Sequence, residues 1–320
     1  MTAGASRLFA DLEVDVEPDA ALGPRTWFGV GGRADALVRP RSIDALQTLV
    51  GRCHRDGIEL RVLGEGANLL VEDEGVGGVV VRLDHPAFRE RQIEGRGGAD
   101  SVRAHAGVEL PRLILETSRA GLAGLEGLAG IPASIGGAVK MNAGGAFGAI
   151  GDRLHAAAVL DRRGEVSVYA AADLKLGYRR ASLPGPVLLW ASFSLESDDP
   201  MRVQERVREV FAYKRSTQPL SDHSAGCMFK NPPPDSSGEK RSAGQLIDQA
   251  GLKGLAVGAA SVSRQHANFV TVAPGATAAD IVALADLVSD RVFDHAGVRL
   301  EREVVVWGRG RGEEGVRHDA

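Results

Sequence analysis

Two glycine-rich segments of this sequence are suited to holding an anion. The first, residues 64–68, consists of Gly64, Glu65, Gly66, Ala67 and Asn68 and lies between two predicted strands. Glycines there let successive backbone N–H groups converge on an anion, and the Asn68 side chain adds a donor. The second segment is 131–138. Each is also compatible with an ordinary glycine turn, but two such loops together can clamp a diphosphate without a helix, which suits a flavin dinucleotide.

A lone cysteine, Cys227, offers a different chemistry. A thiol has an ordinary pKa of about 8.5, so a cysteine side chain can exchange a proton, but nothing in the spacing around Cys227 assigns it that role. The alternative is a small apolar side chain that is simply buried. The other cysteine, Cys53, falls on the apolar face of a predicted helix and is expected to be inert. No CxxC pair is present, and no metal site is predicted.

The composition is that of a globular chain. The sequence has 320 residues, of which 44% are hydrophobic and 25% charged, and the length predicts two or three domains. A net charge of −4 excludes the strongly basic character expected of a nucleic-acid-binding or membrane-surface protein. The N-terminal segment lacks an apolar stretch typical of a signal peptide, and no apolar run is long enough to span a membrane. We therefore expect a cytoplasmic protein with no membrane partner.

Strand and helix signals alternate in the first 200 residues. Ser42 precedes apolar positions with helical spacing up to Cys53, and a second helix is expected over 109–120. Predicted strands cover 59–63, 69–71, 79–83, 155–160, 165–169 and 187–195. The segment 121–151 contains ten glycines, and we expect it to be a long ordered loop without a helix.

A smaller α+β region is expected after residue 200. Asp199 and Pro200 begin a helix whose residues Val203, Val207, Val210 and Phe211 are expected to face inward. Two further helices should begin at Ser242 and Thr277. The strands predicted here cover 256–262, 268–272 and 300–307. Residues 1–25 are expected to form a polar lead-in, and 309–320 a disordered tail.

The glycine-rich stretch Gly121–Gly144 resembles a motif of the UDP-N-acetylenolpyruvoylglucosamine reductase family, and the resemblance extends from Thr26 to Trp307. Other matching segments are 26–35, 62–71, 177–179, 225–232, 242–254, 266–269 and 300–304. The family implies an α+β fold with a two-part FAD-binding region of the PCMH or vanillyl-alcohol-oxidase-like type and a C-terminal α+β substrate-binding domain. On this chain the two FAD-binding parts would cover 26–84 and 85–199, and the substrate domain 200–308.

The resemblance also implies an activity. Members of this family use NADPH and FAD to reduce the enolpyruvyl group of UDP-N-acetylglucosamine-enolpyruvate to UDP-N-acetylmuramate, a step in peptidoglycan precursor synthesis. The implied cofactor is FAD, with NADPH as co-substrate. The implied partners are these two small molecules, with no obligate protein partner.

Three positions match the family's catalytic residues. Arg179 matches the catalytic arginine, and Glu303 the catalytic glutamate, although Arg302 stands where the family usually has proline. Cys227 occupies the position of the family's proton-donating serine. The remaining site residues implied by the resemblance are, for FAD, Gly64, Glu65, Gly66, Ala67, Asn68, Leu69, Ile131, Pro132, Ser134, Ile135, Gly136, Gly137, Asn142 and Arg215, and, for the substrate, Tyr178, Gln218, Lys230, Asn231 and His266.

The chain resembles the shorter type of this family. In the longer type an inserted segment with a substrate-covering tyrosine follows the Tyr-Arg motif, and here only twelve positions separate Tyr178 from Trp190. One alternative is an alcohol oxidase with the same type of flavin-binding region, but neither glycine-rich loop has the histidine that often anchors flavin there. The other is a non-catalytic homologue that binds nucleotide-sugars, against which the three catalytic positions argue.

Overall fold

The computed structural model describes residues 8–94, 101–220, 222–234 and 238–310. The chain forms two compact units, and each has its own hydrophobic core. The first unit takes in the chain up to Ala20 together with Asp35–Glu65 and Gly78–Lys214, and the second takes in Ala21–Ala34, Gly66–Gly77 and the chain from Arg215 onward. The three regions expected from the sequence stay a prediction, and most of the expected tail lies outside the described residues.

The first sheet lies mainly in the first unit and has the strand order β1-β2-β5-β3, with β3 parallel to β5. Its strands are β1 (Val14–Ala21), β2 (Arg33–Pro40), β3 (Leu60–Val62) and β5 (Val76–Val81). β1 falls within the expected polar lead-in, where Val14 and Val16 pack against the core. Helix α2 (Ile43–Arg55) begins as predicted, because the Ser42 hydroxyl accepts a hydrogen bond from the Ala45 amide.

The second sheet of the first unit is antiparallel, with the order β12-β11-β13-β7-β6. Its strands are β6 (Arg91–Glu94), β7 (Ser101–His105), β11 (Leu154–Leu160), β12 (Val166–Ala170) and β13 (Val187–Ser194). Helix α3 (Leu110–Arg119) confirms the second predicted helix. Short elements complete the unit: β8 (Leu122–Ala123) with β14 (Glu196–Ser197), β9 (Gly144–Gly145) with β10 (Gly148–Ala149), and the 3-10 turns η2 (Pro86–Phe88), η3 (Glu126–Leu128), η4 (Ile150–Asp152) and η5 (Ala171–Leu174).

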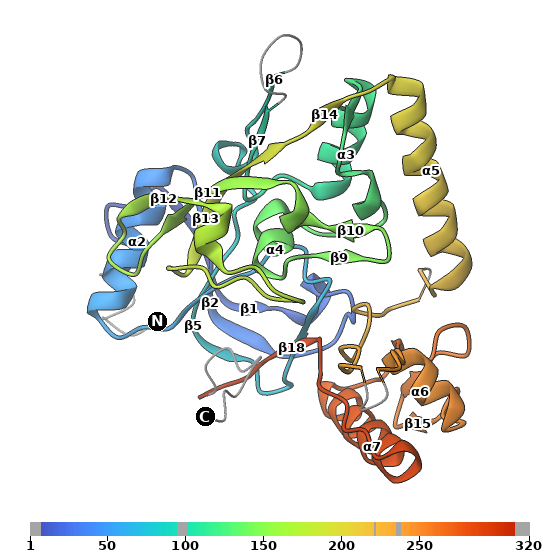
Figure 1. Cartoon of the computed structure of the whole chain (residues 1–320). Coiled ribbons are helices and arrows are strands. Elements are labelled where there is room, and N and C mark those ends of the chain that lie inside the picture. Colours follow the sequence, from blue (N-terminus) through green and yellow to red (C-terminus); the bar gives the residue numbers. More distant parts are fainter. Residues whose placement is uncertain (1–7, 95–100, 221, 235–237, 311–320) are drawn as a thin grey trace. The chain divides into compact units, whose positions relative to one another are not determined.

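The glycine-rich stretch contains a helix that the sequence did not predict. Helix α4 (Ile135–Lys140) includes two glycines and lies beside β13 (Figure 1). It forms because the Ser134 hydroxyl accepts a hydrogen bond from the Gly137 amide, and because Ile135, Ala138 and Val139 are buried. Burial against the sheet therefore outweighs the low helix propensity of glycine.

Helix α5 (Pro200–Thr217) begins where it was predicted. Val203 and Val210 are buried as expected, and Lys214 continues the same face one turn later. The prediction that Phe211 faces inward is wrong, because this side chain is 46% exposed.

The second unit is built around helices α6 (Ala243–Gln249) and α7 (Ala278–Ala296). Both N-terminal caps were predicted, and both are confirmed: Ser242 and Thr277 each form a capping box with the residue three positions later. The unit also contains η1 (Gly23–Arg25), an antiparallel sheet of β15 (Ala256–Val257), β16 (Ala260–Val262) and β17 (Val270–Val272), and a parallel pair of β4 (Leu69–Val71) and β18 (Val305–Trp307).

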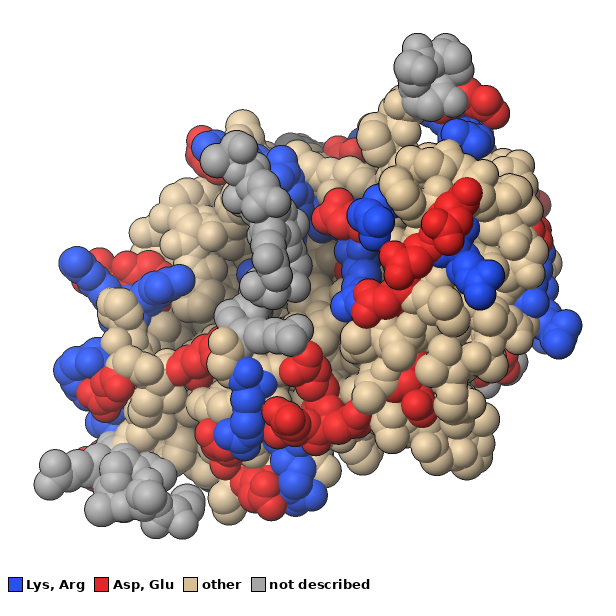
Figure 2. Space-filling view, turned by 90° about the horizontal axis from the view of Figure 1, so that it is seen from below, with Lys and Arg blue, Asp and Glu red and all other residues tan. Residues whose placement is uncertain are grey.

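Acidic and basic side chains lie beside one another on the molecular face drawn in Figure 2. This mixed pattern agrees with the small net charge of −4. Within the described ranges, none of the helices has the length and apolar character needed to cross a membrane.

Candidate active site

The loop 64–68 has backbone donors available for a ligand. Among the residues that the structure describes, none offers an acceptor to the amides of these five residues. The loop is half-buried, and Gly66 needs to be glycine because its φ is +66° and a Cβ atom there would lie 2.4 Å from the Arg25 carbonyl oxygen. Polar backbone groups in such a place are normally satisfied, so an anionic ligand fits here.

Gly64, at the start of the first loop, lies close to the second loop, and both belong to the first unit. A Cβ atom on Gly64 would lie 2.7 Å from the Ser134 hydroxyl oxygen. The amides of this loop are mostly used by the protein itself: Ile135 donates to the Val108 carbonyl at 2.8 Å, and Gly136 to the Ala106 carbonyl at 2.9 Å. The donors that suit a diphosphate are therefore concentrated in the first loop, and the second loop contributes shape through close packing.

Asn142 supports a neighbouring turn in this structure. Its backbone has a φ of +40°, its Nδ2 donates to the Gly177 carbonyl at 2.9 Å, and its Oδ1 accepts from the Gly151 amide at 3.0 Å. Gly177 begins the tight turn that carries Arg179. The Asn142 side chain, which is predicted to contact the cofactor, thus supports the turn of the predicted catalytic arginine. The other predicted FAD residue outside the loops, Arg215, is exposed.

Arg179 is held at a defined place in the first unit. It has a φ of +56°, its Nη1 donates to the Gly144 carbonyl at 2.7 Å, and its guanidinium lies 5.4 Å from the Tyr178 ring centroid. A non-glycine residue in the left-handed region is uncommon and is typical of positions under functional constraint. Tyr178 itself is 54% exposed and accessible to a ligand.

A second cation, Lys214, was not identified from the sequence. It is only 7% exposed, and its Nζ donates to the Ala129 carbonyl at 2.6 Å. Burial, with a smaller contribution from the charge of Arg179, lowers its pKa to about 8. Its position one turn after Val210, on the apolar face of α5, is the signal that would have revealed it.

Cys227 and Glu303 lie on adjacent segments of the second unit. Cys227 forms an isolated bridge with Phe269, and the Glu303 amide donates to the carbonyl of the next residue, Met228, at 2.8 Å. The Asn68 side chain donates to the Glu303 carbonyl at 3.2 Å. The structure therefore brings two predicted catalytic residues together with the end of the first glycine-rich loop. Cys227 is half-buried, so a ligand can reach it.

The predicted substrate residues have different surroundings. Lys230 forms an ion pair with Glu301, while Asn231 Oδ1 accepts from the Ala243 amide at 3.0 Å and supports the start of α6. His266 packs edge-on against Phe269 with 4.8 Å between ring centroids, and burial lowers its pKa. Gln218 is half-buried just after α5.

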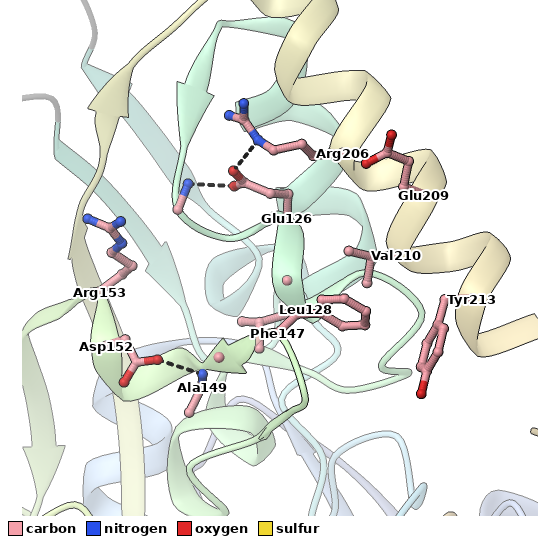
Figure 3. A pocket seen from close by; sticks show the side chains of 13 residues that line it. Glu126, Leu128, Phe147, Ala149, Asp152, Arg153, Arg206, Glu209, Val210 and Tyr213 are labelled. Atoms are coloured by element: carbon pink, nitrogen blue, oxygen red, sulfur yellow. Dashed lines mark hydrogen bonds and ion pairs between the residues drawn. The ribbon is translucent and has the colours of Figure 1, made fainter. Parts of the chain in front are cut away.

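A pocket of about 600 Å³ lies in the first unit, between the glycine-rich stretch and α5 (Figure 3). The rings of Phe147 and Tyr213 meet edge to face at 5.3 Å on one side. On the other side, Glu126 accepts hydrogen bonds from the Gly124 amide and from Arg206 Nε at 2.9 Å. Its lining residues include none of the predicted site residues, and the charged side chains of Glu126 and Arg206 satisfy each other.

Comparison with known proteins assigns both parts of the chain. Residues 34–169 match a family model described as an FAD binding domain, and residues 218–307 match the C-terminal domain of UDP-N-acetylenolpyruvoylglucosamine reductase. The reductase of Moorella thermoacetica is 40% identical over 97% of this chain and 99% of its own, and that of Desulfosudis oleivorans 39% identical over 92% and 95%. The crystal structure of the reductase from Thermus caldophilus superimposes with a TM-score of 0.77 at 39% identity, covering 92% of this chain and 99% of that one. These matches confirm the fold class expected from the sequence.

Proposed function

Since the chain belongs to the UDP-N-acetylenolpyruvoylglucosamine reductase family, we propose that it reduces UDP-N-acetylglucosamine-enolpyruvate to UDP-N-acetylmuramate with NADPH and FAD, in peptidoglycan precursor synthesis. The observation that carries this proposal is the backbone ladder that holds Cys227 and Glu303 on adjacent segments beside Asn68. NADPH is a reductant of the cytoplasm, and the proposal includes that location.

The residues present fit FAD. We assign the FAD diphosphate to the amides of the loop 64–68, for which the described part of the chain offers no acceptor. The loop 131–137 packs against the start of this loop, where Gly64 has no side chain to collide with Ser134. Bound FAD supplies the two-electron chemistry, by which a hydride from NADPH ends on the vinyl carbon of the substrate.

The protein's own residues act on the charge and the proton. As hydride arrives at the vinyl carbon, negative charge develops on the adjacent carbon and its carboxylate. Arg179, fixed by the Gly144 carbonyl, stabilises that charge with its guanidinium, and Glu303, acting in its protonated form, donates a hydrogen bond to it. Cys227 then transfers the proton of its thiol to that adjacent carbon, which completes the addition of two hydrogens across the double bond.

The substrate is anchored in this proposal by five side chains. The Lys230 ammonium group binds an anionic group of the substrate in place of its present partner, Glu301. The exposed ring of Tyr178 is available for stacking. The other members of the set are Gln218, Asn231 and His266.

Flavin absorbance tests the function directly. The purified protein should bind FAD, lose the flavin colour with NADPH in the absence of oxygen, and regain it when the enolpyruvyl substrate is added. A protein that binds no FAD, or whose reduced flavin is not reoxidised by this substrate, would contradict the proposal.

The same assay separates the roles of the side chains. Replacing Arg179 by Lys, or Glu303 by Gln, should slow reoxidation by the substrate by about two to four decades, the range for lost stabilisation of a developing charge or lost acid–base assistance. Reduction by NADPH should change much less. Arg180→Lys is the matched control, because this neighbouring arginine is exposed and should leave both steps unchanged. Equal losses in both half-reactions would argue against these roles.

A further inference from the structure

Asn268 is a buried polar residue to which the mechanism above gives no part. Asn268 is only 3% exposed, and both polar atoms of its side chain form hydrogen bonds. Oδ1 accepts from the Phe229 amide at 2.9 Å, and Nδ2 donates to the Phe229 carbonyl at 2.8 Å. The amide side chain thus pairs with both main-chain groups of one residue, as a neighbouring strand would.

The backbone of Asn268 extends the same contact toward Cys227. The Met228 amide donates to the Asn268 carbonyl at 2.7 Å, and Phe269 forms the bridge with Cys227. On its other side, the segment 227–229 receives the Glu303 amide at the Met228 carbonyl. The segments that carry Cys227, the proposed proton donor, and Glu303 are therefore held by one ladder of main-chain hydrogen bonds, and Asn268 lies at the edge of this ladder opposite Glu303.

The residue that precedes Cys227 does not by itself fix the position of the chain. Gly226 precedes it with a φ of +78°, and glycine loses the most conformational freedom on folding. Among the described residues, a Cβ atom added to Gly226 would have only the Ala67 carbonyl oxygen near it, at 4.0 Å. Because sterics at Gly226 do not fix the chain, the direction of the Cys227 side chain depends on the contacts that follow it.

We propose that Asn268 is a positioning residue, which holds the segment 227–229 so that the Cys227 thiol delivers its proton to one face of the substrate carbon. The inference rests on the proposed function and deepens it. Asn268 acts through the main chain and not on the substrate, so it leaves hydride transfer from NADPH untouched. Displacement of a reacting group by about 1 Å can cost on the order of a hundredfold in rate.

The test is Asn268→Asp, which keeps the acceptor for the Phe229 amide and removes the donor to the Phe229 carbonyl. We expect FAD reduction by NADPH to stay within about twofold of wild type, and reoxidation by the enolpyruvyl substrate to slow by about tenfold to a hundredfold. The product should also contain the opposite configuration at the protonated carbon, because solvent then competes with the displaced thiol. A residue with a purely structural role would not change that configuration.

Ser289→Ala is the matched control. The Ser289 hydroxyl donates to the Leu300 carbonyl at 3.3 Å, so this substitution also removes a buried side-chain-to-backbone hydrogen bond of the second unit. It should leave the rate of reoxidation and the product configuration unchanged. In a Cys227→Ala background, Asn268→Asp should slow reoxidation by the substrate by less than a further factor of about two, since the two residues act on one step.

Equal slowing of both half-reactions, or a slow reaction that still gives a single configuration, would overturn the proposal. If Asn268→Asp does not retain flavin, Asn268→Gln takes its place, and failure of both to give flavoprotein would make Asn268 a folding residue. Failure of the proposed function is seen separately, because wild-type enzyme would then not be reoxidised by the substrate.

Discussion

Lys214 is a buried cation, and replacing it by methionine should change how the stability of the protein depends on pH. Methionine keeps the apolar stem of the side chain and removes the charge. The lysine pKa falls from 10.5 to about 8 in the folded protein, mainly through burial. That change corresponds to roughly 3 kcal/mol against the charged form.

The direction of the pH effect follows from proton binding. Between pH 8 and 10.5 the unfolded chain binds more protons at this site than the folded one, so wild-type stability rises with pH in that window. Below about pH 8 both states are protonated, and the full penalty remains. Relative to Lys214→Met, the wild type should gain about 2 kcal/mol in the free energy of unfolding between pH 7 and pH 9.5.

Two measurements check this prediction. Urea unfolding of both proteins at pH 7 and 9.5 gives the difference, and other titrating groups cancel because both proteins share them. In NMR spectra of protein labelled at lysine Cε, one resonance should titrate near pH 8. The spectrum of Lys214→Met should lack this resonance, and assignment is simple because the chain has only six lysines. A stability difference that does not change with pH, or six lysine resonances that all titrate near 10.5, would refute the reasoning.

Two further predictions concern flavin binding and thiol reactivity. Gly64→Val should lower the ratio of bound flavin to protein, because the new side chain collides with the Ser134 hydroxyl. Gly145→Ala should keep the wild-type ratio, because no described residue other than its chain neighbours lies within 4 Å of the Cβ atom that it adds. Cys53 is buried and its pKa is raised to about 12, so only about one molecule in ten thousand carries the thiolate at pH 8. A thiol reagent should therefore label Cys227 alone in native protein and both cysteines after denaturation, and rapid labelling of both would contradict the burial.

Local signals predicted the elements that frame the site. Ser42, Ser242 and Thr277 each begin a helix, because a cap is a contact between residues three positions apart and can be read directly from the sequence. The inert position of Cys53 followed from helical spacing in the same way. Catalytic assignments at Arg179 and Glu303 came from the family resemblance, since nothing in their spacing alone sets them apart from surface residues.

Contacts between distant segments were not predictable in this way. The glycine pattern indicated two loops that together can clamp a diphosphate, but it did not show that the second loop donates amides to Ala106 and Val108, about thirty positions away. The sequence likewise did not indicate that the Asn142 side chain bonds to Gly177, 35 positions later. Helix α4 formed because burial of its apolar side chains decides the conformation where propensity opposes it.

The same distinction bears on the cysteine at position 227. Asn268 holds the main-chain groups of Phe229 and Met228 and does not hold the side chain at 227, so exchange of a thiol for a hydroxyl leaves these bonds in place. Cys227→Ser should therefore retain the ladder, the flavin and substantial turnover, while Cys227→Ala should nearly abolish reoxidation by the substrate and leave reduction by NADPH intact. Single-turnover absorbance of the flavin measures both steps. If Cys227→Ala is reoxidised as fast as wild type, another group delivers the proton, and the position of the ladder has no catalytic meaning.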